Sequence, residues 1–225
     1  MEIGIDELNV IKEKKRAVPY KEYFDTMDLT AKQKKKREEL SEELEGVMLF
    51  MFTLLSLYRD YSIEINYMNV TATVAKRYMD SIKSMVEDLT NNRVMTDAYV
   101  QEINSYLEEY SKEFADDIVQ STLDNIDDEY YMSNDRAMFA AENEANTVLN
   151  YLEFKEAVAN GKTRKRWVDI RDSRERKTHR QVGGTVIGIE EAFMVGNSLM
   201  MFPKDTSMGA EAKEIIGCRC TIKYF

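Results

Sequence analysis

The residues best suited to bind a metal or to attack a substrate lie close together near the C-terminus of this chain. The single histidine, His179, stands in the stretch KTHRQVGG, and the only two cysteines, Cys218 and Cys220, form a Cys-Arg-Cys triplet. If the last segment, CRCTIKYF, is a strand, both thiols project from one face, because side chains alternate along a strand, and Arg219 points the other way. The three side chains are therefore candidates for a single site.

This set of residues is consistent with a zinc site or with a buried structural corner. Imidazole and thiolate are ligands that zinc accepts, and a fourth ligand could come from Asp172, Asp205 or water. A disulfide across one intervening residue would depart from preferred geometry. Structural zinc sites usually draw on paired spacings on both sides, and the upstream pair lacks one member here. In the alternative, hydrogen bonds satisfy His179 in a buried polar corner without metal.

A catalytic role for the cysteines is less well supported. His179 and Asp172 could supply the base and the orienting carboxylate that a cysteine nucleophile needs. However, the Cys-x-Cys segment offers no helix N-terminus to lower a thiol pKa and no glycine-rich turn to bind an oxyanion. The sequence also contains no P-loop, dinucleotide fingerprint, G-x-S-x-G or H-E-x-x-H motif. We therefore expect that the protein is not an enzyme.

Composition favours a largely helical chain. Only two prolines and nine glycines occur in 225 residues, so few positions interrupt a helical hydrogen-bond ladder. The apolar stretch from Val47 to Tyr58 is flanked by charged residues and is shorter than the roughly 20 residues that span a bilayer as a helix. It predicts a buried core helix, and no membrane partner is expected.

Four long helices are predicted from apolar residues that recur at steps of three and four. They cover residues 30–61, 70–89, 96–124 and 134–160. Thr30 with Gln33 resembles a capping box, and Asn160-Gly161 is a typical C-terminal signal. In the third helix the expected core stripe consists of Tyr99, Ile103, Tyr106, Tyr110, Phe114 and Ile118.

After Gly161 the pattern changes to short runs rich in β-branched and aromatic residues. These runs are KRWVDI, GTVIGI, LMMFP and CRCTIKYF, and turn residues separate them. The predicted fold class is α+β, in which a helical region of residues 1–130 precedes a small α+β module of residues 131–225.

Charge is distributed unevenly along the chain. The formal net charge is −10, yet the segment from Lys162 to Arg180 is strongly basic and the tract from Asp97 to Asp135 is acidic. The basic segment is a candidate for contact with phosphates or carboxylates. The alternative is a solvated face that pairs with the protein's own acidic tract, which the low sequence pI of about 4.9 favours.

The C-terminal module resembles the corresponding domain of the Mu F-like phage head morphogenesis family, the minor capsid proteins of tailed phages. Eight landmarks occur in order, from an arginine that opens a helix to the terminal Cys-Arg-Cys. The residues that match the family pattern as structural positions are Arg136, Glu144, Trp167, Gly184, Phe193, Pro203 and Asp205, with Asn143 beside Glu144. The chain departs from zinc-binding relatives, which have Cys-x-x-Cys where Arg176 and His179 stand, and His-Pro-x-Cys before the final triplet.

The resemblance implies a virion protein present in few copies, which acts near the portal vertex during head assembly in the host cytoplasm. Its implied partners are the portal, the major capsid protein or the scaffold, on which residues 1–130 would dock, together with packaged DNA in some relatives. A DNA-contacting patch would consist of Arg164, Lys165, Arg166, Arg174 and Arg176. The alternatives are a delivered, toxin-like enzyme and an adaptor that contacts only protein.

Overall fold

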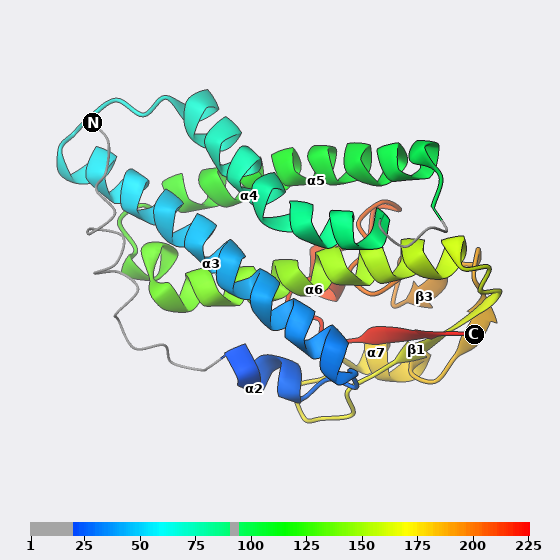
Figure 1. Ribbon diagram of the computed structural model, residues 1–225. Helices are drawn as coiled ribbons and strands as arrows, with labels where there is room; N and C mark the ends of the chain where they lie inside the picture. Colours follow the sequence, from blue (N-terminus) through cyan, green and yellow to red (C-terminus); the bar gives the residue numbers. More distant parts are fainter. Residues whose placement is uncertain (1–19, 91–94) are drawn as a thin grey trace. The chain divides into compact units, whose positions relative to one another are not determined.

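The computed structural model describes residues 20–90 and 95–225 (Figure 1). Their contacts form two compact units. The first, called the helical unit below, contains residues 39–88 and 96–141. The second, called the α+β unit, contains residues 20–38 and 142–225 with the described part of 89–95. The predicted division near residue 130 stays a prediction.

The helical unit is built from three long helices that pack through apolar side chains. It comprises most of α3 (Ala31–Asp60), α4 (Tyr67–Thr90), α5 (Asp97–Leu123), the short η1 (Glu129–Met132) and the start of α6 (Asn134–Ala159). Val47, Met48, Met51, Phe52 and Leu55 of α3 are buried in a core that also contains Val74, Val119 and Ala137. The predicted core helix is therefore confirmed.

The ends of α3 and α6 carry the expected capping contacts. The Gln33 backbone N–H donates to Thr30 Oγ1 at 3.3 Å, and Gln33 Oε1 accepts from the Thr30 N–H at 3.0 Å, which is the reciprocal capping box. At the start of α6, Ser133 Oγ accepts from the Arg136 N–H at 3.2 Å. Beyond its end Gly161 adopts φ +70°, which glycine tolerates without a Cβ clash.

The predicted core stripe of α5 was wrong in part. The buried line of this helix is Ile103, Leu107, Ser111, Ala115, Val119 and Thr122. The tyrosines and Phe114 lie half-buried on its flank, where the rings of Tyr110 and Phe114 contact Tyr78 of α4 at 6.3 Å and 5.1 Å between centroids. Where the buried line narrows to Ser111 and Ala115, the helices can approach closely, so the large rings of Tyr110 and Phe114 pack from the side.

The α+β unit contains a three-stranded antiparallel sheet and a separate hairpin, which confirms the predicted α+β class. The sheet order is β2 (Val186–Gly188), β1 (Arg164–Val168), β5 (Thr221–Tyr224), and the hairpin joins β3 (Phe193–Val195) to β4 (Ser198–Met200). The unit also contains the start of α3, most of α6 and three short helices: α2 (Tyr20–Asp25), α7 (Lys177–Val182) and α8 (Ala212–Ile215). The sequence did not predict β3, α7 or α8, and both cysteines precede β5 instead of lying within it.

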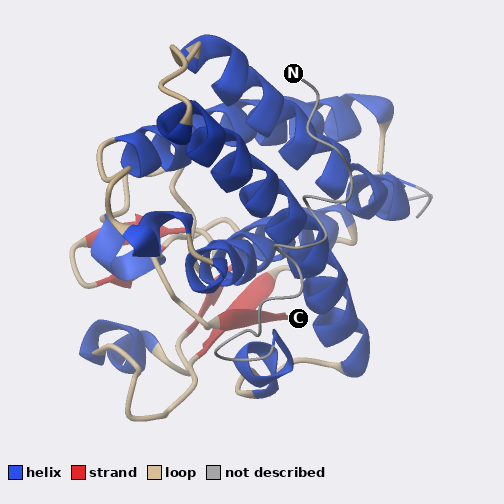
Figure 2. Cartoon of the chain, turned by 90° about the vertical axis from the view of Figure 1, so that its left-hand side faces the viewer, coloured by secondary structure: helices blue, strands red, loops and turns tan. Residues whose placement is uncertain are grey.

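Helix α6 packs against the C-terminal end of the chain within the α+β unit. Phe154 contacts Phe202 and Tyr224, with ring centroids 5.4 Å and 6.5 Å apart. The side chain of Asn146 donates to the Cys218 carbonyl at 3.1 Å. Figure 2 shows the C-terminus at the end of a strand. Residues from α6 and from the last ten positions therefore support each other.

Among the described helices, none combines the length and the apolar character that crossing a membrane requires.

Candidate functional site

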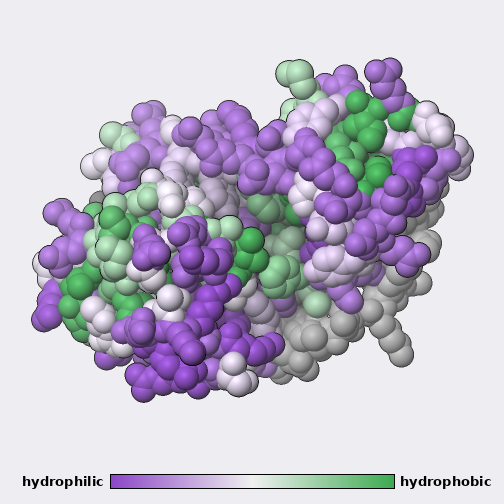
Figure 3. Space-filling view, turned by 180° about the vertical axis from the view of Figure 1, so that it is seen from behind, coloured by the Kyte–Doolittle hydropathy of each residue, from purple (hydrophilic) through white to green (hydrophobic). Residues whose placement is uncertain are grey.

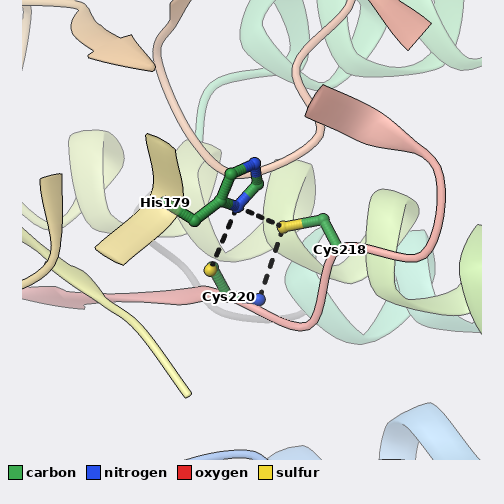
Figure 4. Close-up of side chains that lie close together, drawn as sticks. All are labelled: His179, Cys218 and Cys220. Atoms are coloured by element: carbon green, nitrogen blue, oxygen red, sulfur yellow. Dashed lines mark hydrogen bonds between the residues drawn. The ribbon is translucent and has the colours of Figure 1, made fainter. Parts of the chain in front are cut away.

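The structure brings His179, Cys218 and Cys220 together. His179 lies on α7, and both cysteines lie on the segment between α8 and β5 (Figure 4). His179 Nδ1 is 3.4 Å from the sulfur of Cys218 and 3.4 Å from that of Cys220. Each of the three residues is only 2% exposed. The two thiols face the same ring although they precede the strand, so the predicted proximity of the three residues is confirmed.

Two glycines allow the chain to make this arrangement. Gly183 follows α7, and a Cβ there would lie 2.3 Å from the carboxyl carbon of Asp169. Gly217 adopts φ +68° directly before Cys218, and its conformation turns the chain from α8 toward β5. A larger residue at Gly183 would displace Asp169 or the end of the helix that carries His179.

A carboxylate that the sequence did not identify holds the other side of the imidazole. Glu214 Oε2 lies 3.1 Å from His179 Nε2, and the same oxygen accepts from the Thr178 hydroxyl at 2.8 Å. Glu214 is itself 3% exposed. Because a carboxylate accepts a hydrogen bond, it favours a proton on Nε2, and Nδ1 is the ring nitrogen that faces the two sulfurs.

The two thiols have different pKa values because of their local interactions. Burial alone would raise the pKa of Cys218, but hydrogen bonds with Cys220 and His179 hold that pKa well below its usual value. The pKa of Cys220 is raised by its hydrogen bond with Cys218 and by burial. Burial opposes protonation of His179, but its contact with Cys218 raises the imidazole pKa. The cluster therefore favours a single negative charge on Cys218 beside the histidine.

The indole of Trp167 closes the cluster from the sheet. Its ring meets the His179 ring edge-on, with centroids 5.9 Å apart, and Trp167 is fully buried. Its buried Nε1–H has no hydrogen-bond partner among the described residues. The same N–H opposes the rise in the Cys220 pKa, which indicates that it faces that sulfur.

These donors suit a soft metal ion such as zinc. All three donor atoms lie within 4.8 Å of one another. The Nδ1 to sulfur distances of 3.4 Å match the roughly 3.5 Å expected between nitrogen and sulfur ligands of one tetrahedral zinc. Glu214 on the opposite ring nitrogen is the outer carboxylate that metal-binding histidines commonly have.

The predicted fourth ligands lie elsewhere. The carboxylate of Asp172 accepts from Arg219 at 2.6 Å and from the Arg174 N–H at 2.9 Å. Asp205 accepts from the Met201 and Ser207 backbone N–H groups at 2.8 Å and 2.9 Å. Both carboxylates are thus committed to local structure, and the described residues supply three donors to the cluster.

A comparison with protein families decides what kind of chain this is. A family model described as Phage Mu protein F like protein matches residues 73–223. The chain belongs to this family. The Mu F-like family is a phage head morphogenesis family, so the resemblance found in the sequence is confirmed. No curated protein and no solved structure matches the chain.

Most residues of the Mu F-like pattern are buried in this chain. Arg136 is buried in the helical unit, where its guanidinium donates to Thr122 Oγ1 at 2.7 Å and to Ser121 Oγ at 3.0 Å. Gly184 adopts φ +80°, and its N–H donates to the Trp167 carbonyl at 2.9 Å. The other pattern residues are buried in the α+β unit: Glu144, Phe193, Pro203 and Asp205.

One member of the predicted DNA-contacting patch was wrong. Lys165 is fully buried, donates to the Met201 carbonyl at 2.7 Å, and lies over the rings of Phe154 and Phe193. Burial lowers the pKa of Lys165 to about 8. Its side chain alternates with those of its neighbours along β1 and therefore points into the unit.

The four arginines of the predicted patch lie nearer the surface. Arg164 and Arg174 are exposed, and Arg166 and Arg176 are half-buried. Arg166 lies over the Phe225 ring, 5.8 Å from its centroid, and Arg176 donates to the Ile216 carbonyl. The surface charge of the patch is thus carried mainly by Arg164 and Arg174.

Proposed function

We propose that this Mu F-like protein is a minor structural component of the phage head that acts near the portal vertex during head assembly, and that it is not an enzyme. Family membership supports the role in head assembly. The observation that supports a structural role most strongly is the burial of the cluster. His179, Cys218 and Cys220 are each 2% exposed, so this pairing of a nucleophile with a base is closed to a substrate.

The surface of α5 is the best candidate for docking on the portal or the scaffold. Its exposed carboxylates are Asp97, Glu102, Glu108, Glu109, Glu113, Asp116 and Asp117. Beside them a groove of about 470 Å³ opens between α4 and α5, with Met68 and Ala72 among its lining residues. Met68 is 80% exposed, and Figure 3 shows apolar residues reaching the surface in patches among hydrophilic ones. An acidic helix beside an apolar groove suits a basic, amphipathic partner segment.

Charge reversal on this helix tests the docking proposal. Glu109, Glu113 and Asp117 follow one face of α5 at steps of four residues and are exposed. We expect their joint change to lysine to abolish co-purification with the portal or scaffold protein from cells that assemble heads. A matched triple on α3, Glu39→Lys with Glu42→Lys and Glu43→Lys, changes the net charge equally and should leave co-purification intact. Equal retention of both triples would contradict the assignment of α5.

We propose a contact with packaged DNA only for Arg164, Arg166, Arg174 and Arg176. Nearby Arg171 and Arg180 pair closely with carboxylates, Asp169 at 3.2 Å and Glu175 at 3.1 Å, whereas Arg174 Nε lies farther from its neighbour, 3.9 Å from Asp172 Oδ2. Each phosphate contact should contribute about 0.9 to the slope of log affinity against log salt.

The two exposed arginines provide the test of DNA contact. Arg164→Glu with Arg174→Glu should remove salt-sensitive retention on DNA. Lys76→Glu with Lys83→Glu, in the helical unit, makes the same charge change and should not. Unchanged retention of the arginine pair would remove the DNA contact from the proposal.

Zinc is the ion that we propose for the cysteine cluster, as a structural link between α7 and the segment before β5. The ion would be held by His179, Cys218 and Cys220, and it would supply cross-linking without adding a reactive group at the surface. Elemental analysis should find one zinc per chain in protein purified without chelators, and none in Cys218→Ser. Wild-type protein that is zinc-free after growth in zinc-supplemented medium would contradict the ion but not the structural role.

A further inference from the structure

A second buried polar cluster lies in the α+β unit and involves none of the three candidate zinc ligands. It consists of Lys204, which is fully buried, Asn143, which is 9% exposed, and Glu144, which is 4% exposed. Asn143 and Glu144 are neighbours on α6, whereas Lys204 lies in the turn that follows β4, where its backbone adopts φ +72°. An amine, a carboxamide and a carboxylate are thus enclosed together without solvent.

The contacts within this cluster have a definite direction. Lys204 Nζ donates to the side-chain oxygen of Asn143. The backbone N–H of Gly217 donates to the same oxygen at 2.7 Å. On the other side of the carboxamide, Asn143 Nδ2 donates to Glu144 Oε1 at 3.0 Å. The amine therefore lies against the carbonyl side of the amide, and the carboxylate lies against its nitrogen.

We propose that Lys204 and Asn143 form an intramolecular isopeptide bond in the mature protein. In this step the lone pair of the neutral Lys204 amine attacks the Asn143 side-chain carbonyl carbon. A new carbon to Nζ bond forms, the bond from that carbon to Nδ2 breaks, and one ammonia leaves. Nζ releases one proton and Nδ2 takes one up as it leaves; Glu144, whose charge acts on Lys204 and whose Oε1 contacts Nδ2, relays this proton and is regenerated. The balance needs no oxidant, reductant, metal or other reactant.

Each neighbouring group favours this reaction. The Gly217 N–H is placed to stabilise the negative charge that develops on the Asn143 oxygen during attack. Burial lowers the pKa of Lys204 to about 8, so about a tenth of the amine is neutral at pH 7. Enclosure also holds amine and amide in contact, which replaces a bimolecular encounter with a positioned one. Glu144 acts as the proton carrier because it already contacts the departing nitrogen.

Lys165 is a second buried lysine in the same unit, and its surroundings differ from those of Lys204. Lys165 is equally buried, and burial lowers its pKa to about 8 as well. However, its amine donates to a backbone carbonyl, that of Met201, at 2.7 Å. Its other near neighbours are the rings of Phe154 and Phe193. Lys165 is therefore an internal control, since its pKa is lowered like that of Lys204 but its amine does not contact a side-chain carboxamide.

The test is the intact mass of the full-length protein, followed by peptide mapping. We expect wild-type protein to be lighter than its sequence by one ammonia. Lys165→Arg should show the same loss, whereas Lys204→Arg and Glu144→Gln should have the full sequence mass. Glu144→Gln is nearly isosteric, so it keeps the test informative if Lys204→Arg prevents folding. Circular dichroism establishes that each variant is folded.

Peptide mapping identifies the bond. We expect a branched tryptic peptide that contains both Asn143 and Lys204, together with no cleavage after Lys204. Full mass in the wild type would overturn the proposal. An ammonia loss confined to a linear peptide would assign it to cyclisation of Asn143 alone, and loss of a water would make Glu144 the acyl partner; either result would also overturn it.

Discussion

The two units of this protein bury different kinds of side chain. In the helical unit the core is apolar, with Met48, Met51 and Leu55 fully buried, and the buried charged residues described there are Glu45 and Arg136. The α+β unit buries, besides apolar residues, several charged or titratable side chains: Arg37, Glu144, Lys165, His179, Lys204, Asp205, Glu214 and Arg219. A core substitution in the helical unit mainly removes packing contacts. A substitution of a buried polar residue in the α+β unit also leaves its buried partner without a hydrogen bond or counter-charge. The helical unit should therefore tolerate conservative changes that the α+β unit does not.

The largest expected effect is at Arg37. Its guanidinium donates to Asn146 Oδ1 at 3.0 Å, to Asn150 Oδ1 at 3.2 Å and to Glu153 Oε1 at 2.7 Å. Arg37→Ala should lower the free energy of unfolding by about 3–5 kcal/mol, because it leaves these groups unpaired. Urea denaturation followed by circular dichroism measures the change.

Conservative substitutions should affect the two units differently. Arg37→Lys should remain destabilising, because lysine cannot reproduce the planar fork of donors. Met51→Leu in the helical unit should cost less than about 1.5 kcal/mol. If Arg37→Lys were tolerated as well as Met51→Leu, the contrast between the units would be wrong.

A smaller effect is the pH dependence that Lys165 imposes. Its folded pKa of about 8 lies below the unfolded value, so the unfolded state binds more protons between pH 8 and 10.5. Stability should therefore rise with pH across this window, by about 2 kcal/mol from pH 7 to pH 10 for this residue.

The matched variant for this prediction is Lys165→Met, which removes the titrating group and keeps a flexible apolar chain. Urea denaturation at pH 7 and pH 10 should show a smaller gain for the variant than for the wild type. Parallel pH profiles for the two proteins would show that Lys165 is solvated and fully charged in the folded state.

The smallest expected effect is at the cap of α3. Thr30→Ala removes the acceptor for the Gln33 N–H and should cost about 1 kcal/mol. Thr30→Ser keeps the hydroxyl and should be nearly neutral. A loss for serine equal to that for alanine would mean that the hydroxyl contact does not stabilise the helix.

The helices could be predicted because their signals are local. Thr30, Ser133 and Gly161 act within one turn of the chain, and the structure shows their contacts or conformations directly. The core line of α5 was harder, because an aromatic stripe and the adjacent line through Ser111 and Ala115 have the same helical spacing. Which of them is buried depends on how closely the neighbouring helix approaches.

The candidate metal site could be predicted only in part, because not all of its residues stand out in the sequence. His179, Cys218 and Cys220 stood out because their residue types are rare in this chain. Glu214 did not, since an acidic chain offers many equivalent carboxylates. The burial of Lys165 had a signal, because it stands two residues before Trp167 on the same strand and therefore shares its inward face. The prediction weighed its charge and overlooked its position on the strand.

The most direct measurement for the proposed role is the amount of this protein in purified phage particles. Quantitative mass spectrometry of gradient-purified heads, compared with the portal protein as an internal standard, gives the number of copies per particle. We predict a small, constant number that persists after a high-salt wash and falls when the α5 face is charge-reversed. A protein abundant in the lysate but absent from washed particles would contradict its role as a head component.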